Sequence, residues 1–225
     1  MKFFLVFLCL FSEVLIYSNP HKIISRACAT SLLPKAVSTM RSHANIQNIQ
    51  RSIIPHRKIK GIVVEGTDCS GKTTLMDVLK SRLCHLGWDI VNLGHRDGNQ
   101  FDRYMSHYLH ADKVIFDRGH FSEIVHGNLW RAGHGMSTKE VNDLNEYVFT
   151  NFLVIFVHAP EEILKERYYA RAFNQIIKSD ELAIVQSRLA ALLTHPYVLK
   201  YDSSSLNERD VMVEKVLLLL NNTQA

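Results

Sequence analysis

The sequence predicts an α/β fold of three layers, in which helices cover both faces of a parallel sheet of five strands. Apolar runs bounded by turns recur along the chain, and segments of helical periodicity separate them. Strands that alternate with helices build parallel sheets, because each crossover returns the chain to the same edge. The expected strands are Gly61–Glu65, Asp89–Leu93, Lys113–Asp117, Phe152–His158 and Tyr197–Tyr201.

Seven helices are expected between and after these strands. The first ends at Gly87, and a later one begins at Pro160 with two glutamates behind it, which suits a helix first turn. In such a sheet ligands bind beyond the carboxyl ends of the strands. The expected helices are Lys72–Leu86, Phe101–Leu109, Phe121–Arg131, Ser137–Thr150, Pro160–Ala172, Asp180–Leu193 and Asn207–Leu220.

A glycine-rich segment, Glu65–Thr74, follows the first strand directly and reads E-G-T-D-C-S-G-K-T-T. Its glycines allow a tight loop whose N–H groups face an anion, and the following helix adds a positive partial charge. Lys72 is expected to reach the β- and γ-phosphates of ATP, and Thr73 to offer its hydroxyl oxygen to Mg²⁺. This segment predicts a P-loop NTPase fold. The candidate ATP-binding residues are Gly66, Thr67, Ser70, Gly71, Lys72, Thr73 and Thr74.

Three observations narrow the class of phosphate-loop protein. The sequence contains no N-K-x-D motif for reading guanine, which disfavours a GTPase. The third strand ends in Asp117 and Arg118, not in the glutamate that polarises water in an ATPase, and this favours transfer to a bound acceptor. The segment after the first sixty residues has about 165 residues, a length that suits a small kinase.

Two motifs carry a family resemblance. The phosphate loop with Asp68, and the run D-R-G-H-F-S-E-I-V-H-G from Asp117 to Gly127, resemble the signatures of thymidylate kinases and related viral deoxynucleotide kinases. The resemblance spans nearly all of residues 61–220. It implies an ATP- and Mg²⁺-dependent kinase that converts a deoxynucleoside monophosphate to the diphosphate, with thymidylate preferred.

The same resemblance implies roles for single residues. Asp68 would contact the sugar of the acceptor. Asp117, together with Thr73, would hold Mg²⁺ or its water, and Arg118 would hold the acceptor phosphate. The chain departs from the family at two places. The Arg-Glu-Pro segment of the family is replaced by Gly94-His95-Arg96-Asp97-Gly98, so Arg96 is the one residue of that type that remains to bind the acceptor. In addition, His126 stands where related proteins often have Tyr.

An arginine is expected to close over the transferred phosphoryl group, whose oxygens gain charge. The phosphate loop has Cys69, not arginine, after its acid. Arg167 and Arg171 are spaced i, i+4 and would share one helix face, as the arginines of the family's lid do. The alternative is a solvated face on which they pair with glutamates of the same helix.

Phe121 is a candidate for contact with the acceptor base, because it lies inside the second motif. The alternative is that Phe121 packs in the core, which is the more frequent role of aromatic residues at helical spacing.

Two other functions remain open. A deoxynucleoside kinase on the same fold would need a general base, usually a glutamate beside an arginine, since its acceptor is a neutral hydroxyl. A nucleotide-binding regulator without turnover is disfavoured by the presence of Lys72, Thr73 and Asp117 together. An acceptor phosphate is already ionised, so a monophosphate kinase needs no base.

We expect residues 1–60 to form an N-terminal leader and residues 61–225 to form the kinase domain. A short apolar run after Lys2 resembles a signal peptide, and the basic, Ser/Thr-rich segment that follows resembles a transit peptide. Together they predict delivery to an organelle, either a plastid through the secretory pathway or a mitochondrion. Translation from Met40 would leave the protein in the cytoplasm.

The charge distribution bears on partners. The leader holds nine basic residues and one acid, which leaves 17 basic and 21 acidic residues beyond it. A net-negative domain offers no electrostatic attraction to polymeric nucleic acid. The expected partners are small nucleotides, no membrane is expected after leader removal, and a homodimer is left open.

Overall fold

The computed structural model describes residues 58–171 and 178–222. Residues 1–57 of the predicted leader lie outside the described residues. The described residues form a five-stranded, all-parallel sheet in the order β2-β3-β1-β4-β5. The predicted α/β class and sheet are confirmed. The strands are β1 Gly61–Glu65, β2 Asp89–Asn92, β3 Val114–Asp117, β4 Phe152–His158 and β5 Val198–Asp202.

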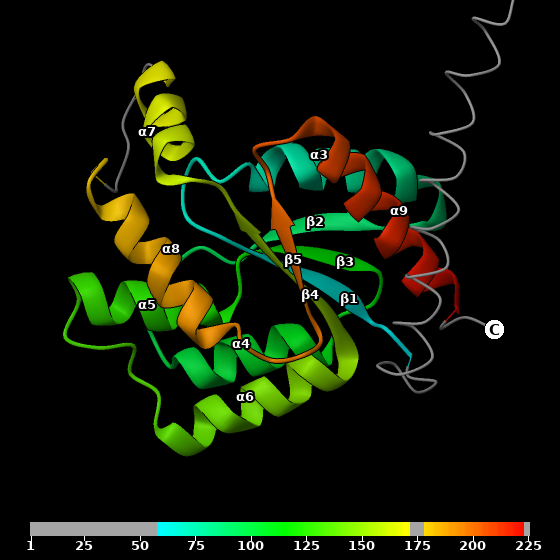
Figure 1. Cartoon of the computed structure of the whole chain (residues 1–225). Coiled ribbons are helices and arrows are strands. Elements are labelled where there is room, and N and C mark those ends of the chain that lie inside the picture. The colour runs from blue at the N-terminus through cyan, green and yellow to red at the C-terminus, as the bar shows by residue number, and fades with distance from the viewer. Residues whose placement is uncertain (1–57, 172–177, 223–225) are drawn as a thin grey trace, which may run out of the picture. The chain divides into compact units, whose positions relative to one another are not determined.

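Helices cover both faces of this sheet (Figure 1). Each expected helix is present, with bounds shifted by a few residues. A short 3₁₀ turn, Cys84–Leu86, extends the first helix and ends at Gly87, which has a left-handed conformation. The helices are α3 Lys72–Leu83, α4 Gln100–Leu109, α5 His120–Trp130, α6 Thr138–Asn151, α7 Glu161–Ala170, α8 Glu181–Leu192 and α9 Leu206–Asn222.

Strand β1 divides the core into two halves because successive side chains point to opposite faces. Ile62 and Val64 pack in the cluster formed with α3 and α9. Val63 packs in the other cluster, with buried residues of α4, α6 and α8. All five residues of β1 are buried, as expected for the central strand of a covered parallel sheet.

The pairing register determines which residues lie side by side at the carboxyl ends of the strands. Val64 of β1 lies opposite Asp117 of β3, and Glu65 lies opposite Phe156 of β4. Asn92 of β2 lies opposite Asp117 on the other side. The carboxyl ends of β1, β2 and β3 therefore bring Glu65, Asn92 and Asp117 to one edge, directly before the phosphate loop and α5.

Two residues that precede β1 also belong to this fold. Ile59 is buried in the core cluster beside α3 and α9. The backbone N–H of Lys60 donates to the carbonyl of Asn151 at 2.8 Å, and its amine donates to the hydroxyl of Tyr147 at 2.7 Å. Among the residues described, no helix has both the length and the apolarity to cross a bilayer.

Candidate active site

The phosphate loop joins the buried end of β1 to the first turn of α3. Gly71 has φ 92° at the N-terminus of α3, and Gly66 has φ 154°. A Cβ atom at Gly66 would lie 2.3 Å from the carbonyl oxygen of Val157, so no other residue fits there without movement of β4. The loop therefore depends on glycine for both conformation and close approach.

Lys72 turns back across this loop. Its side chain is buried, with the residue 7% exposed, and its amine donates to the carbonyl oxygen of Thr67 at 2.7 Å. Burial, with a smaller contribution from the nearby charge of Arg118, lowers the pKa of Lys72 to about 7 against the opposing effect of Asp68 and Asp117. An anion placed at this loop would restore the charged form of the amine.

Two hydroxyls of the loop are buried without a partner. The hydroxyl oxygens of Thr67 and Ser70 are buried and have no hydrogen-bond partner among the described residues. Buried hydroxyls usually find a partner, so this pair fits a loop built to bind a polar ligand. Thr73 and Thr74 are exposed on the first turn of α3.

Glu65 fastens the loop to the start of α5. Its carboxylate is fully buried and accepts hydrogen bonds from the N–H groups of Gly119 at 2.8 Å and Ser122 at 3.2 Å, and from the Ser122 hydroxyl. Burial raises the pKa of Glu65, while these hydrogen bonds and the charge of Arg118 oppose the rise. Every one of these bonds holds the Asp117–Ser122 segment against β1.

Arg118 lies at the centre of the site in a strained backbone conformation. Its φ is 70°, a left-handed value that is rare for a residue with a side chain. The guanidinium forms an ion pair with Asp68 and donates to the carbonyl oxygen of Gly66 at 3.2 Å and to Ser122 at 3.4 Å. The structure thus brings Asp68 and Arg118, fifty residues apart in sequence, into direct contact.

Asp117 points one oxygen at the site. Its Oδ2 accepts a hydrogen bond from the side-chain amide of Asn92 at 2.7 Å. Its Oδ1 is buried and has no hydrogen-bond partner among the residues described. Asn92 therefore orients the carboxylate and leaves the other oxygen for a ligand.

Arg167 reaches the phosphate loop from α7. Its guanidinium donates to the hydroxyl of Ser203 at 2.8 Å, to the carbonyl of Ser203 at 2.7 Å and to the carbonyl of Cys69 at 3.3 Å. These contacts do not involve the glutamates of α7, one of which, Glu161, pairs with Lys165. Arg167 thus lies beside the loop and not on a solvated charged face.

The expectation that Arg167 and Arg171 share one helix face is wrong. Helix α7 ends at Ala170, and Arg171 follows in an extended conformation, so the i, i+4 spacing does not apply. Arg171 is nevertheless near the loop. Burial raises the pKa of the Cys69 thiol, and the charge of Arg171 is the strongest effect opposing that rise.

Of two further acceptor candidates, one is buried in the core and the other is exposed. Phe121 is only 1% exposed and packs against the rings of His120 at 4.0 Å and Phe149 at 5.6 Å, so it belongs to the core and does not face the site. Although Phe121 lies inside the second motif, it is on the face of α5 that packs in the core. Arg96 is exposed in the loop before α4, and its charge acts on His107 of that helix.

The structure adds groups that the sequence reasoning did not assign. Ser122, Asn92 and Ser203 orient Arg118, Asp117 and Arg167, as described above. His126 has a buried Nε2 without a hydrogen-bond partner in the described part of the chain. Burial, with a smaller contribution from the charge of Arg118, lowers its pKa to about 4. The one feature of the sequence that drew attention to His126 is that related proteins often have Tyr at this position.

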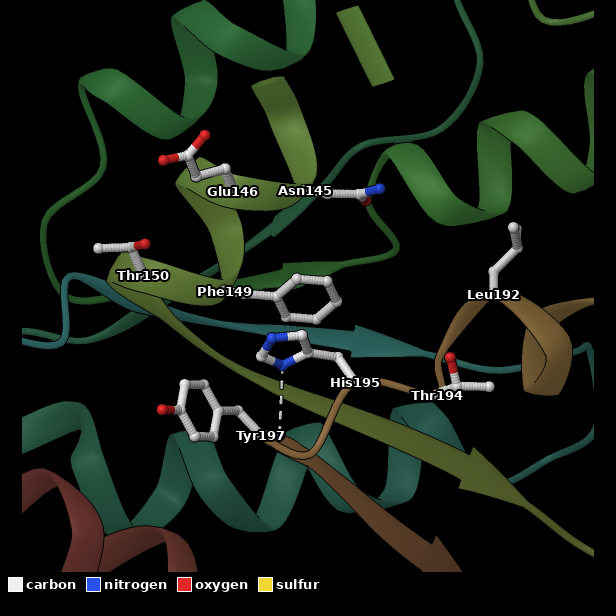
Figure 2. Close-up of a pocket in the computed structure, with 8 residues that line it drawn as sticks. All are labelled: Asn145, Glu146, Phe149, Thr150, Leu192, Thr194, His195 and Tyr197. Carbon is white, nitrogen blue, oxygen red and sulfur yellow. Dashed lines mark hydrogen bonds between the residues drawn. The ribbon is translucent and has the colours of Figure 1, made fainter. Parts of the chain in front are cut away.

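The cavity drawn in Figure 2 lies away from these residues. It has a volume of about 600 Å³ and lies between the end of α6 and the loop before β5. The stacked rings of Phe149 and His195 form one wall, with centroids 4.1 Å apart. These segments precede β4 and β5, so the cavity is at the amino ends of the strands, opposite the phosphate loop. The geometry of the side chains, not cavity size, identifies the candidate active site.

Comparisons with known proteins agree with the motifs. No family model matches the chain. The chain is 25% identical over 190 residues to a probable thymidylate kinase of Saccharolobus solfataricus, an alignment that covers 72% of this chain and 98% of the relative. This similarity confirms the resemblance that the two motifs indicate and supports a phosphotransferase that acts on nucleotides.

A solved structure shares the fold. The YorR protein of Bacillus subtilis, crystallised with phosphorylated GDP, superposes with a TM-score of 0.59 at 16% identity, covering 72% of this chain and 95% of YorR. The three-layer arrangement of sheet and helices is therefore shared with this solved structure.

Proposed function

We propose that this chain, a relative of the thymidylate kinases among the P-loop nucleotide kinases, transfers the γ-phosphoryl group of ATP to a deoxynucleoside monophosphate, with thymidylate preferred. One observation carries the proposal. Lys72, Arg118 and Asp117 meet at the carboxyl ends of β1 and β3, beside two buried hydroxyls that have no partner among the described residues. Two cations, a carboxylate and oriented hydroxyls suit a polyphosphate better than any uncharged ligand.

The donor would occupy the phosphate loop. Backbone N–H groups between Gly66 and Lys72, with the start of α3, offer a cradle for the β-phosphate. Lys72 would leave the carbonyl of Thr67 and follow the β- and γ-phosphates. Arg167 already touches the loop through Cys69, so it can reach the transferred group by a side-chain rotation.

The residues present also fit Mg²⁺. Asp117 offers a buried oxygen without a partner, and carboxylate and hydroxyl oxygens are the ligand types that this ion prefers. Thr73 offers a hydroxyl on α3. When bound, Mg²⁺ would neutralise charge on the phosphate oxygens. Such ions take one or two protein oxygens and complete their shell with phosphate and water, so a larger cluster of acids is not required.

The acceptor would approach from the side of Arg118. An oxygen of its ionised phosphate attacks the γ-phosphorus, the bond from that phosphorus to the β–γ bridging oxygen breaks, and ADP leaves with the electron pair. Arg118 would hold the acceptor phosphate, and Asp68 would accept a hydrogen bond from the sugar hydroxyl. The strained backbone at Arg118 is consistent with a residue whose position matters for function.

Transfer to a nucleoside hydroxyl is less well supported. That reaction needs a base, and the buried glutamate closest to the arginine, Glu65, has its carboxylate occupied by Gly119 and Ser122. A phosphate acceptor needs no proton removed.

The test is ADP release from ATP and Mg²⁺ with a panel of nucleosides and of their 5′-monophosphates. We expect release with thymidylate and none with thymidine, and Lys72→Ala should remove it without changing the melting temperature by more than a few degrees. Arg82→Ala, on the exposed end of α3, is the matched control. Turnover with nucleosides alone would replace the proposal by a nucleoside kinase, and no release above the Lys72→Ala level with any acceptor would refute a kinase.

A further inference from the structure

Glu123 is a buried acid that the proposed reaction does not use. It lies on α5 five residues beyond Arg118, and its side chain is 3% exposed. Its Oε1 forms an ion pair with Nη2 of Arg131, and its Oε2 lies 3.2 Å from Nδ1 of His95. A buried carboxylate is costly unless it is paired, so the pair with Arg131 holds both groups in a defined geometry.

Arg131 is thereby directed back along α5. It follows the last residue of the helix, and its guanidinium returns two turns to Glu123, where Nη2 also donates to the Glu123 carbonyl at 3.4 Å. The low pKa of His126 results from burial and from the charges of Arg118 and Arg131, with Asp68 and Lys72 also acting on it. Glu123 lies only five residues beyond Arg118, so its ion pair brings the guanidinium of Arg131 to the end of α5 that is closer to Arg118.

Arg131 has hydrogen-bonding capacity to spare. Within the described part of the chain, the hydrogen bonds of its guanidinium all come from Nη2 and go to Glu123. Its side chain is 30% exposed, so Nη1 and Nε remain accessible to a ligand. A guanidinium only donates, and a buried carboxylate that fixes its plane makes those donors directional.

We propose that Arg131, positioned by Glu123, donates hydrogen bonds to a carbonyl oxygen of the acceptor base. This inference rests on the proposed function and names its substrate class: keto bases, namely thymine, uracil and guanine. With its phosphate on Arg118, a monophosphate extends its base along α5 toward Arg131. Cytosine and adenine carry an amino group on the corresponding edge, and an amino donor opposite a guanidinium leaves both groups unpaired.

Steady-state kinetics with the full chain test the proposal. We expect kcat/KM for thymidylate and dGMP to exceed that for dCMP and dAMP by about 100-fold, near the upper end of the effect of leaving one buried polar group unpaired. Arg131→Ala should raise KM for thymidylate by at least tenfold and leave dCMP and ATP within about threefold. Glu123→Gln should act in the same direction with a smaller effect. Arg82→Ala is the matched control.

Equilibrium binding of thymidylate and dCMP without ATP separates this inference from the proposed reaction. Tighter binding of thymidylate that is lost in Arg131→Ala supports the inference even if no ADP is released, in which case only the proposed reaction fails. Equal binding of both nucleotides to the unmodified protein, or an equal loss of both in a folded Arg131→Ala, overturns it. Arg131→Lys, which keeps the charge but not the planar fork, should recover part of the preference.

Discussion

Lys72 donates a hydrogen bond to the carbonyl oxygen of Thr67, 2.7 Å away, so the amine closes the phosphate loop on itself. Burial lowers its pKa to about 7, and at pH 8 most molecules therefore carry a neutral amine. Binding of ATP should restore the charge, because phosphates favour the ammonium form.

The first prediction is uptake of about 0.9 proton per ATP bound at pH 8. Titration calorimetry in two buffers of different ionisation enthalpy measures it, and Lys72→Met should abolish the difference between buffers. Proton uptake that is unchanged in this variant would assign the linkage to another group.

The second prediction concerns Arg167, which contacts Cys69 and Ser203. Arg167→Ala should lower kcat by about 100-fold or more, the scale of a lost transition-state arginine, with a smaller change in KM. Arg171→Ala, beyond the end of α7, is measured beside it to identify which arginine serves as the lid. Equal and mild changes in kcat and KM for both variants would remove both from the reaction.

The third prediction concerns the ion pair of Asp68 and Arg118. Asp68→Asn should lower kcat/KM for the monophosphate acceptor at least tenfold, since a sugar hydroxyl loses its anionic acceptor and Arg118 loses its anchor. ATP affinity measured without acceptor should change by less than threefold. Asp112→Asn, at an exposed position, is the control. Collapse of ATP binding with acceptor kinetics preserved would move Asp68 to the donor site.

The fourth prediction concerns stability in acid. His120 is fully buried between Tyr108 and Asn145, and burial lowers its pKa to about 4 from 6.5. A histidine with a lowered pKa stabilises the fold above pH 6.5, and this contribution is lost as the pH falls toward 4. From pH 7 to pH 5 the loss from His120 is about 2 kcal/mol.

Urea unfolding at both pH values measures this loss. His120→Gln should reduce the difference between them by about that amount, even though it lowers stability at pH 7, and His85→Gln on the surface should not. His126 contributes in the same direction, so some pH dependence should remain. An unchanged pH dependence in His120→Gln would show that this imidazole is not the responsible group.

The fifth prediction concerns the N-terminal segment. A chain that begins at Arg57 should retain full activity and stability. A chain that begins at Gly61 should lose about 2 kcal/mol, because it lacks the buried Ile59 and the hydrogen bonds of Lys60. Thermal unfolding compares the two. Residues 1–60 fused to a fluorescent protein should direct it to an organelle, and a diffuse cytosolic signal would refute the targeting hypothesis.

Much of the fold was predictable because it depends on local patterns. Strands β1 and β4 have the predicted bounds, since continuous apolar runs between turns define buried parallel strands. The phosphate loop was also predictable, because its glycines and Lys72 act within ten consecutive residues. The shared helix face of Arg167 and Arg171 and the exposure of Phe121 could not be predicted from local patterns, since helical spacing tells neither where α7 ends nor which face of α5 the core covers.

The sequence by itself determined the α/β class, the phosphate loop and the presence of an Asp-Arg pair after the third strand. The tertiary structure alone decided which distant groups meet: Asp68 with Arg118, Asn92 with Asp117, Arg167 with Ser203 and Glu123 with His95. The physical reason is the parallel sheet. Its register brings the carboxyl ends of β1, β2 and β3 to one edge, and the orientation of charged side chains there depends on burial and hydrogen bonds between segments remote in the chain.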